Sequence, residues 1–296
     1  MKILKHPFES NPDEFYEYLL LGPLTAIYLA KKKTQFNIIK EFSNLLIDKF
    51  AIHSSSFFHL SKGIIELKKS NEKIKMKGFD LFTVNSTFRT MMESYATFNN
   101  IFVEPKSEEE EEFRFLLWKL DGLFDKEKFD IGENDFPEAK ELLERDKKIL
   151  AETVAKIEAC NFYNVLPKLE LEKVYKPDKS KTNWRFLIDD NLKVTPLKIT
   201  DLIKHTCKTK GFINNYRYTS THAHTNYLSI EHFKQTRGIP IPDEYVNPIT
   251  KLAIYLTCLM ISDITLIDDN AKKVFQNLPN EVKEYVTGIT KAIKKQ

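Results

Sequence analysis

The sequence predicts a predominantly α-helical fold, a helical bundle with an irregular insertion around residues 161–200. Two observations support this prediction: the chain has only 8 glycines among 296 residues, and apolar residues recur every three or four positions along most of it. Few glycines mean few tight turns, which disfavours β-sandwiches, barrels and glycine-rich phosphate loops. The spacing is that of amphipathic helices. We therefore expect one helical domain over residues 1–296, with residues 161–196 as an irregular excursion.

The composition is typical of a soluble globular protein. Hydrophobic residues make up 42% of the chain and charged residues 29%. The 45 Lys and Arg against 42 Asp and Glu give a net charge of +3, which disfavours nucleic-acid binding through a strong uniform field but allows a local basic patch. The cysteines, Cys160, Cys207 and Cys258, are widely spaced and predict buried apolar residues rather than a disulfide framework or a zinc site. The first 15 residues lack the apolar stretch of a signal peptide, so we expect a cytoplasmic protein.

The N-terminal part predicts three helices. The first covers residues 14–30 and should be broken or kinked at Pro23. The second and third follow over residues 36–50 and 53–69, where apolar residues form one helical stripe. A polar, lysine-rich turn is expected over residues 70–78.

The middle of the chain predicts a central helix followed by two more polar ones. Residues 79–103 are apolar on almost every side, so this helix should be covered from several directions and should stop before Pro105. Ser107 can cap the next helix, whose first turn carries the acidic run 108–112 in favourable interaction with the helix dipole. Residues 138–159 predict a long, partly exposed amphipathic helix.

The C-terminal part returns to helical spacing after the proline-containing excursion, which could include a small hairpin. Four helices are expected, over residues 197–207, 211–227, 249–268 and 279–294. Residues 249–267 have the length of a membrane span. However, Lys251 and Asp263 lie within them, and a charge in lipid is costly. We expect a buried core helix and no membrane partner.

The segment 216–230 carries the most distinctive chemistry. If it is helical, with about 100° per residue, Arg217 and His224 fall on nearly the same face, with Ser220 and Thr221 between them. A guanidinium binds phosphate oxygens in a fork, and an imidazole can move a proton near neutral pH. This line of side chains would suit a phosphodiester, although a polar stripe packed against an acidic helix is a commoner explanation of such spacing.

A metal site in the same segment is a weaker alternative. His222 and His224 could be ligands together with Glu93 or Asp201, but two residues apart on a helix they diverge by about 200°. We therefore expect no metal and no cofactor. Asn226 follows just past this turn.

Arg89 and Glu93 lie four residues apart on the central apolar helix, where a buried pair must be compensated by bonding. One interpretation is a purely structural intrahelical salt bridge. The other is that Glu93 orients Arg217 or His224 while Arg89 adds positive charge to a cleft.

Tyr216, Arg217, Ser220 and His224 resemble the Y-R-x-x-S-x-x-x-H segment of DUF5677, a family of bacterial helical proteins. That family also shows R-x-x-x-E on an earlier apolar helix, which Arg89 and Glu93 match. The resemblance covers roughly residues 80–270, with residues 79–103 and 211–268 as its core.

Arg-x4–6-His is separately the motif of HEPN ribonucleases, which occur in toxin–antitoxin and phage-defence systems. Arg217 matches it with His224 or with His222, and the shared helix face favours His224. HEPN enzymes usually have a polar residue directly after the arginine, where this chain has Tyr218.

The HEPN resemblance implies metal-independent cleavage of RNA, in which the ribose 2′-hydroxyl attacks the adjacent phosphorus. His224 would assist proton transfer and Arg217 would stabilise the transition-state charge, in an enzyme that pairs two copies and could have an antitoxin partner. Glu93 completes the expected catalytic set. The residues expected to bind or support are Arg89, Tyr216, Ser220, Thr221, His222 and Asn226. The alternative is a non-catalytic helical module that binds a partner protein or a nucleotide through the same residues.

Overall fold

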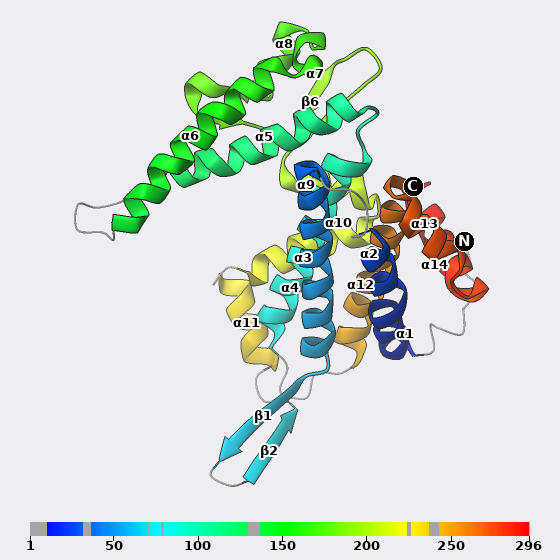
Figure 1. Ribbon diagram of the computed structural model, residues 1–296. Coiled ribbons are helices and arrows are strands. Elements are labelled where there is room, and N and C mark those ends of the chain that lie inside the picture. The colour runs from blue at the N-terminus through cyan, green and yellow to red at the C-terminus, as the bar shows by residue number, and fades with distance from the viewer. Residues whose placement is uncertain are drawn as a thin grey trace. The chain divides into compact units, whose positions relative to one another are not determined.

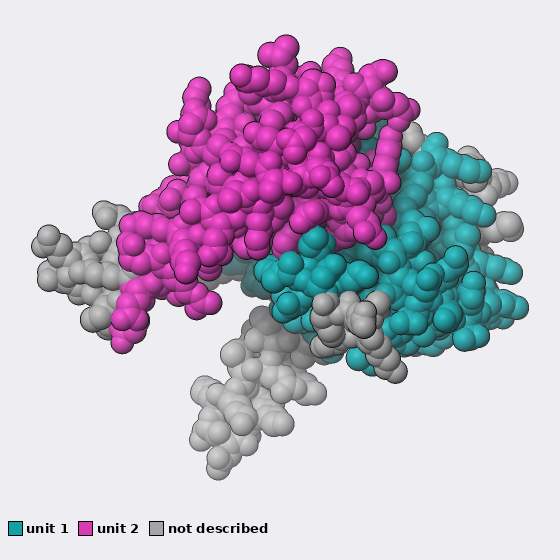
Figure 2. Space-filling view, turned by 45° about the horizontal axis from the view of Figure 1, so that its top comes forward, with its two compact units in different colours: residues 1–99, 203–296 teal, residues 100–202 magenta. Residues whose placement is uncertain are grey.

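The computed structural model describes most of the chain, and every statement below refers to the described residues. These are residues 11–31, 37–69, 72–77, 80–129, 137–223, 226–236 and 243–295. The fold is predominantly α-helical, as the sequence predicts (Figure 1). The chain divides into two compact units, one formed by Met1–Asn99 with Ile203–Gln296 and the other by Asn100–Leu202 (Figure 2).

The first unit contains the central helix and most of the C-terminal helices. Its elements are α1 (Pro12–Leu19), η2 (Leu20–Leu24), α2 (Thr25–Lys31), α3 (Ile38–Ser61), β1 (Ile64–Lys69), β2 (Glu72–Lys77), α4 (Leu81–Phe98), the end of α9 (Ile199–Cys207), α10 (Lys210–His222), α11 (Tyr227–Thr236), α12 (Asp243–Ile267), α13 (Asp269–Gln276) and α14 (Asn280–Lys294).

The second unit pairs two long helices with short irregular elements. Its elements are most of η3 (Asn99–Val103), α5 (Glu108–Glu127), α6 (Pro137–Ala159), α7 (Asn161–Val165), α8 (Lys168–Leu171), β3 (Tyr175–Lys176), η4 (Pro177–Lys179), β4 (Lys181–Thr182), β5 (Phe186–Ile188), β6 (Val194–Pro196) and the start of α9.

Helix α4 lies in the core of the first unit, as its apolar pattern predicts. It packs against α3, α10 and α12, and the side chains of Phe88, Met91 and Met92 have no exposed surface. Asp80 caps its first turn by accepting hydrogen bonds from two backbone N–H groups. A helix buried on so many sides is a rigid support for any polar group that it carries.

A buried carboxylate on α12 explains how a charge is accommodated in that apolar helix. Asp263 accepts hydrogen bonds from Tyr95 at 2.9 Å and Asn99 at 2.8 Å, and Lys294 lies 2.5 Å from its other oxygen. Such pairing is what a buried charge requires. Within α12, Pro248–Ile267 is long and apolar enough to cross a membrane by length and composition, and 67% of its most apolar window is buried inside the protein.

Pro23 interrupts the first helix, as expected. The π-helical turn η2 separates α1 from α2, and the Thr25 hydroxyl donates to the Leu20 carbonyl at 2.7 Å. The side chain of Thr25 thus satisfies a carbonyl within the interrupted turn.

Two predictions in the N-terminal half are wrong. Residues 36–50 and 53–69 do not form separate helices, because α3 runs unbroken from Ile38 to Ser61. Residues 64–69 then form β1, which pairs with β2 in an antiparallel hairpin instead of extending the helix. Gly63, with φ of 63°, ends the helical path at the hairpin's start, a conformation that glycine adopts readily.

The excursion at 161–200 is irregular, as predicted, and contains two small antiparallel pairs, β3 with β4 and β5 with β6. Ser107 caps α5 as expected, accepting a hydrogen bond from the Glu110 N–H. The three cysteines are free and buried.

Candidate functional site

Helix α10 carries Tyr216 and Arg217 and ends earlier than the sequence pattern indicates. Its last residue is His222, and the N–H of Ala223 closes it on the Thr219 carbonyl at 3.0 Å. Asn226 starts a new helix, α11, because its side chain accepts a hydrogen bond from the Ser229 N–H at 2.9 Å.

The predicted single helix over residues 211–227 is therefore wrong, because an asparagine that caps backbone donors begins a second helix there. His224 lies outside the described residues. Because α10 ends at His222, a continuous helix does not run from Arg217 to position 224. Asn226, expected as a supporting site residue, acts as a helix cap.

Arg89, Glu93 and Tyr216 form one polar network between α4 and α10. The Arg89 Nε donates to Glu93 Oε1 at 2.9 Å, and the Tyr216 hydroxyl donates to the same oxygen at 2.8 Å. The Arg89 guanidinium carbon is 5.4 Å from the centre of the Tyr216 ring. The arginine and glutamate side chains remain 26% and 34% exposed. We call these three residues the α4–α10 network.

The network raises the pKa values of both Arg89 and Tyr216. Burial, followed by the hydrogen bond to the Glu93 carboxylate, raises the pKa of Tyr216 to about 12. Burial is also the largest influence on Arg89 and alone would lower its pKa. The combined attraction of Glu93 and Tyr216 outweighs it, so the pKa of Arg89 lies above its ordinary value.

Arg217 follows Tyr216 and is exposed, whereas Tyr216 is 3% exposed. The hydroxyls predicted to line up with Arg217 donate to the helix's own carbonyls: Ser220 to Tyr216 at 2.7 Å and Thr221 to Arg217 at 3.2 Å. Their protons are thus used within the helix, and only their lone pairs remain for a ligand. Glu93, expected beside Arg217 or His224, contacts Tyr216 instead.

His222 is buried, with 3% of its surface exposed. Its Nε2 lies 3.3 Å from Nδ1 of His232 on α11, and the two rings stack with centres 5.2 Å apart. Burial, then the charge of His232, lowers the pKa of His222, which keeps it neutral at pH 7. His222 and the exposed Arg217 do not share a face, as their spacing predicts. In the described part of the chain, no three His, Cys, Asp or Glu side chains are placed to hold a metal ion.

A pocket of about 530 Å³ in the first unit was missed by sequence reasoning. Its polar lining consists of hydroxyl groups along α4 and two imidazoles, His53 on α3 and His222 on α10; Phe82, Ala223 and Ile230 complete it. The hydroxyls come from Thr83, Ser86, Thr87 and Thr90. Their spacing of three, four and seven residues places them on one helix face. A polar stripe on an otherwise apolar helix was the signal that could have revealed this pocket.

Comparison with known proteins gives one match, to a protein-family model. The model of DUF5677, a family of unknown function, matches residues 74–238, more than half of the chain. The match includes the whole α4–α10 network and the polar stripe of α4. Neither the curated proteins nor the solved structures give a match. The match covers α4 and α10, which carry the predicted motif, and it ends at residue 238, whereas the sequence resemblance was expected to extend to about residue 270. The chain belongs to the DUF5677 family.

Proposed function

We propose that this protein is a metal-independent endoribonuclease of HEPN type. Arg217 is the phosphate-binding group and His224 carries the proton in this proposal. The observation that supports it best is the position of Arg217. The neighbouring Tyr216 is held by Glu93 and Arg89 on the buried helix α4, while Arg217 itself is exposed.

The chemistry follows from these positions. An exposed guanidinium on an anchored helix can bind two phosphate oxygens and stabilise the charge of a pentacoordinate phosphorus. A histidine can take the proton of the attacking 2′-hydroxyl and return one to the leaving oxygen. The described residues on either side of position 224, Ala223 and Asn226, are exposed.

The α4–α10 network has a positioning role in this proposal. Glu93 and Arg89 contact Tyr216 rather than the reacting groups. They hold the helix turn from which Arg217 projects, and Arg89 contributes a permanent positive charge. The surrounding sequence adds exposed cations, Lys204, Lys208 and Lys210, that can attract RNA.

The test is cleavage of single-stranded RNA by the full chain with EDTA present. We expect Arg217→Ala and His224→Ala to lower the cleavage rate at least about a hundredfold each, the usual effect of removing such groups. Arg145→Ala and His59→Ala, which remove an exposed arginine and an exposed histidine elsewhere, serve as matched controls. Cleavage that requires a metal, or that is unchanged in both variants, contradicts the proposal.

The proposal includes a homodimer, because the HEPN resemblance implies that two Arg–His sets face each other. Light scattering of the purified chain measures this directly. A chain that stays monomeric while cleaving RNA would show that one copy suffices, and this part of the proposal would be wrong.

A non-catalytic binding module is the second candidate, and one observation favours it. Glu93 Oε1 is shared by Arg89 and Tyr216, so the network satisfies itself and offers no evident catalytic base. Folded protein without any RNA cleavage, under conditions that include candidate triggers, would favour this candidate.

A further inference from the structure

The pocket beneath α4 carries features of a binding site that the proposed ribonuclease chemistry does not use. Its volume of about 530 Å³ lies in the range of small-molecule sites, which are mostly apolar with a few placed polar groups. The groups that line the pocket determine which chemical class of ligand it can bind.

The hydroxyl row presents acceptors more than donors. Thr87 and Thr90 donate to the carbonyls of Thr83 and Ser86 at 2.7 and 2.9 Å, and Thr83 donates to the Asp80 carboxylate. A hydroxyl whose proton is already used can still accept from a ligand N–H. The row therefore suits a ligand with amine or imine donors.

The imidazoles of the lining add neutral hydrogen-bonding groups. His222 Nδ1 is buried and has no hydrogen-bond partner among the described residues, although its Nε2 is paired with His232. His53 stands on the α3 side, and the pKa values of both histidines are lowered, which keeps both rings uncharged at neutral pH.

The charge distribution disfavours an anionic ligand. Among the described residues that line the pocket there is no lysine or arginine. The Asp80 carboxylate, which accepts a hydrogen bond from the Thr83 hydroxyl, would repel a phosphate. On the α3 side, the positive charge of Lys49 acts on His53 and contributes to its lowered pKa. A phosphate needs several donors or cations, and the hydroxyls of Thr83, Thr87 and Thr90 already donate within the protein.

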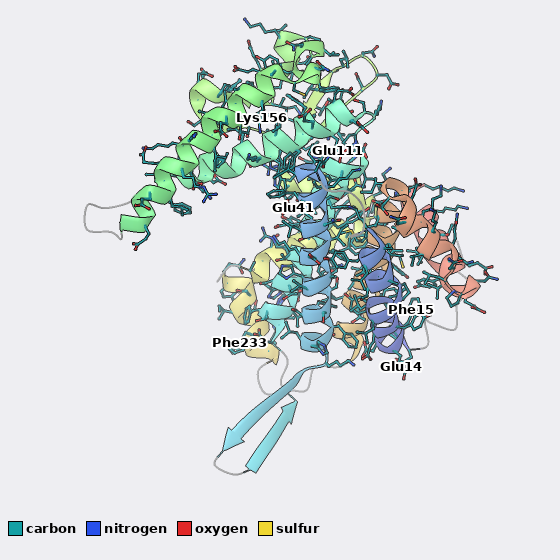
Figure 3. The ribbon with its side chains drawn as sticks, in the orientation of Figure 1. Glu14, Phe15, Glu41, Glu111, Lys156 and Phe233 are labelled. Atoms are coloured by element: carbon teal, nitrogen blue, oxygen red, sulfur yellow. The ribbon has the colours of Figure 1, made fainter. Side chains whose placement is uncertain are left out.

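Phe82 adds an aromatic ring to the lining. The Phe82 ring lies 6.0 Å from the His222 ring and 5.6 Å from Phe233 on α11, labelled in Figure 3. Planar rings with polar edges stack on such groups, as unpaired bases do on aromatic and histidine side chains in RNA-binding proteins.

We propose that this pocket binds an uncharged heteroaromatic ring with N–H donors, the chemistry of a nucleobase. The ring stacks against Phe82 and the neutral imidazoles of the lining and donates to the α4 hydroxyls. The ligand is a base of an RNA strand or a free nucleoside. The assignment does not depend on RNA cleavage; if the proposed function holds, the pocket receives one base of the substrate.

The test is calorimetric titration of the full chain with adenosine, guanosine, cytidine and uridine, with ribose and inorganic phosphate as controls. We expect at least one nucleoside to bind and neither control to bind. Ala223→Phe adds a ring at an exposed, pocket-lining position and should abolish binding, whereas Ala155→Phe, at an exposed position on α6, should leave it unchanged. Thermal unfolding of both variants checks that they are folded.

A milder variant keeps the test decisive if Ala223→Phe fails to fold. Ser86→Ala removes one lining hydroxyl and should weaken nucleoside binding about threefold to tenfold, the loss of one hydrogen bond. Competition by a short single-stranded RNA would identify an RNA base as the source, and nucleoside binding without such competition would identify a free nucleoside. The assignment is overturned if no nucleoside binds, or if Ala223→Phe is folded and binds as the parent does. A chain that binds nucleosides but cuts no RNA would overturn only the proposed function.

Discussion

Two arginine–glutamate pairs with the same helical spacing differ sharply in their surroundings. In the second unit, Arg114 and Glu110 on α5 have side chains only 2% and 7% exposed, with Arg114 Nη2 2.6 Å from the carboxylate. In the first unit, Arg89 and Glu93 on α4 are 26% and 34% exposed, with a single contact at 2.9 Å. One pair is enclosed, and solvent reaches the other.

The partners of the two pairs show what each can do. Arg114 also donates to the Asn100 carbonyl and side-chain oxygen and to the Phe186 carbonyl, at 2.9–3.2 Å, so it joins η3, α5 and β5 of the second unit. Burial lowers its pKa. Arg89 has Glu93 and the face of Tyr216. The same two residue types therefore hold a core together in one place and position a helix beside an exposed guanidinium in the other.

The largest expected effect is on the enclosed pair. Arg114→Met leaves the Glu110 carboxylate buried without its cation and two carbonyls without a donor. We expect the free energy of unfolding to fall by about 3–5 kcal/mol, measured by urea denaturation. Adding Glu110→Gln to Arg114→Met should recover part of the loss. If Arg114→Met is as stable as the parent, the enclosed pair does not stabilise the core of the second unit, and the difference drawn between the two pairs is wrong.

Removing the hydroxyl that joins the half-buried pair to α10 should have a smaller effect. Tyr216→Phe loses one hydrogen bond and should lower the free energy of unfolding by about 1 kcal/mol at pH 7. Its effect should also depend on pH. Between pH 10 and about 12 an unfolded tyrosine loses its proton while the native Tyr216 keeps it. The native state then binds more protons, so the parent's advantage should shrink as the pH rises.

Burial also raises the pKa of Tyr16 and Tyr175, so the parent and the Tyr216→Phe variant should both lose stability in this alkaline range. The measurement is the difference between their stabilities at pH 8 and pH 11. A constant difference would contradict the position assigned to the Tyr216 proton.

Glu93→Gln should change stability less again, by under about 1 kcal/mol, because the pair is partly exposed and the amide oxygen can still accept from Tyr216. RNA cleavage should nevertheless fall, with the decrease in kcat rather than in KM if Glu93 only positions the helix that carries Arg217. Rescue by Glu93→Asp would not be expected, because the shorter carboxylate cannot reach both partners. Unfolding by Glu93→Gln would make this pair structural, like the one on α5.

The smallest expected effect is a decrease in the free energy of unfolding at acid pH, which comes from His222. Because the pKa of His222 is lowered from 6.5, the unfolded chain takes up a proton below that pH while the native side chain does not. The unfolded state then binds more protons, and the free energy of unfolding should fall as the pH drops below 6.5. His222→Asn should flatten this slope. His53, whose pKa is also lowered, contributes in the same sense, so some slope should remain.

Local sequence signals predicted much of the fold because they report local physics. The Ser107 cap, the interruption at Pro23 and the apolar surface of α4 each act through neighbouring backbone or one helix face. The acidic run 108–112 was identified as a helix start for the same reason. That Glu110 is the member of this run that turns inward to Arg114 was not predicted, because the other partners of Arg114, the side chain and carbonyl of Asn100 and the carbonyl of Phe186, come from outside α5.

Within the candidate site, the sequence predicted only those contacts whose two residues lie on one helix. The spacing of Arg89 and Glu93 correctly indicated an interacting pair, yet Tyr216, 123 residues from Glu93, was expected only as a supporting residue. The end of α10 at His222 was missed because Asn226 can extend a helix or cap a new one, and the sequence pattern does not choose between these. The pocket was missed because its walls come from four separate helices.

The sequence by itself determined the helical class, the family membership and the chemistry available along each helix, because these depend on spacing and residue type. The tertiary structure decided which charges are enclosed, which remain in reach of solvent and which hydroxyls face a pocket. Burial and pairing arise where distant segments of the chain meet. An arginine–glutamate pair therefore contributes differently to stability depending on how completely those segments exclude water from it.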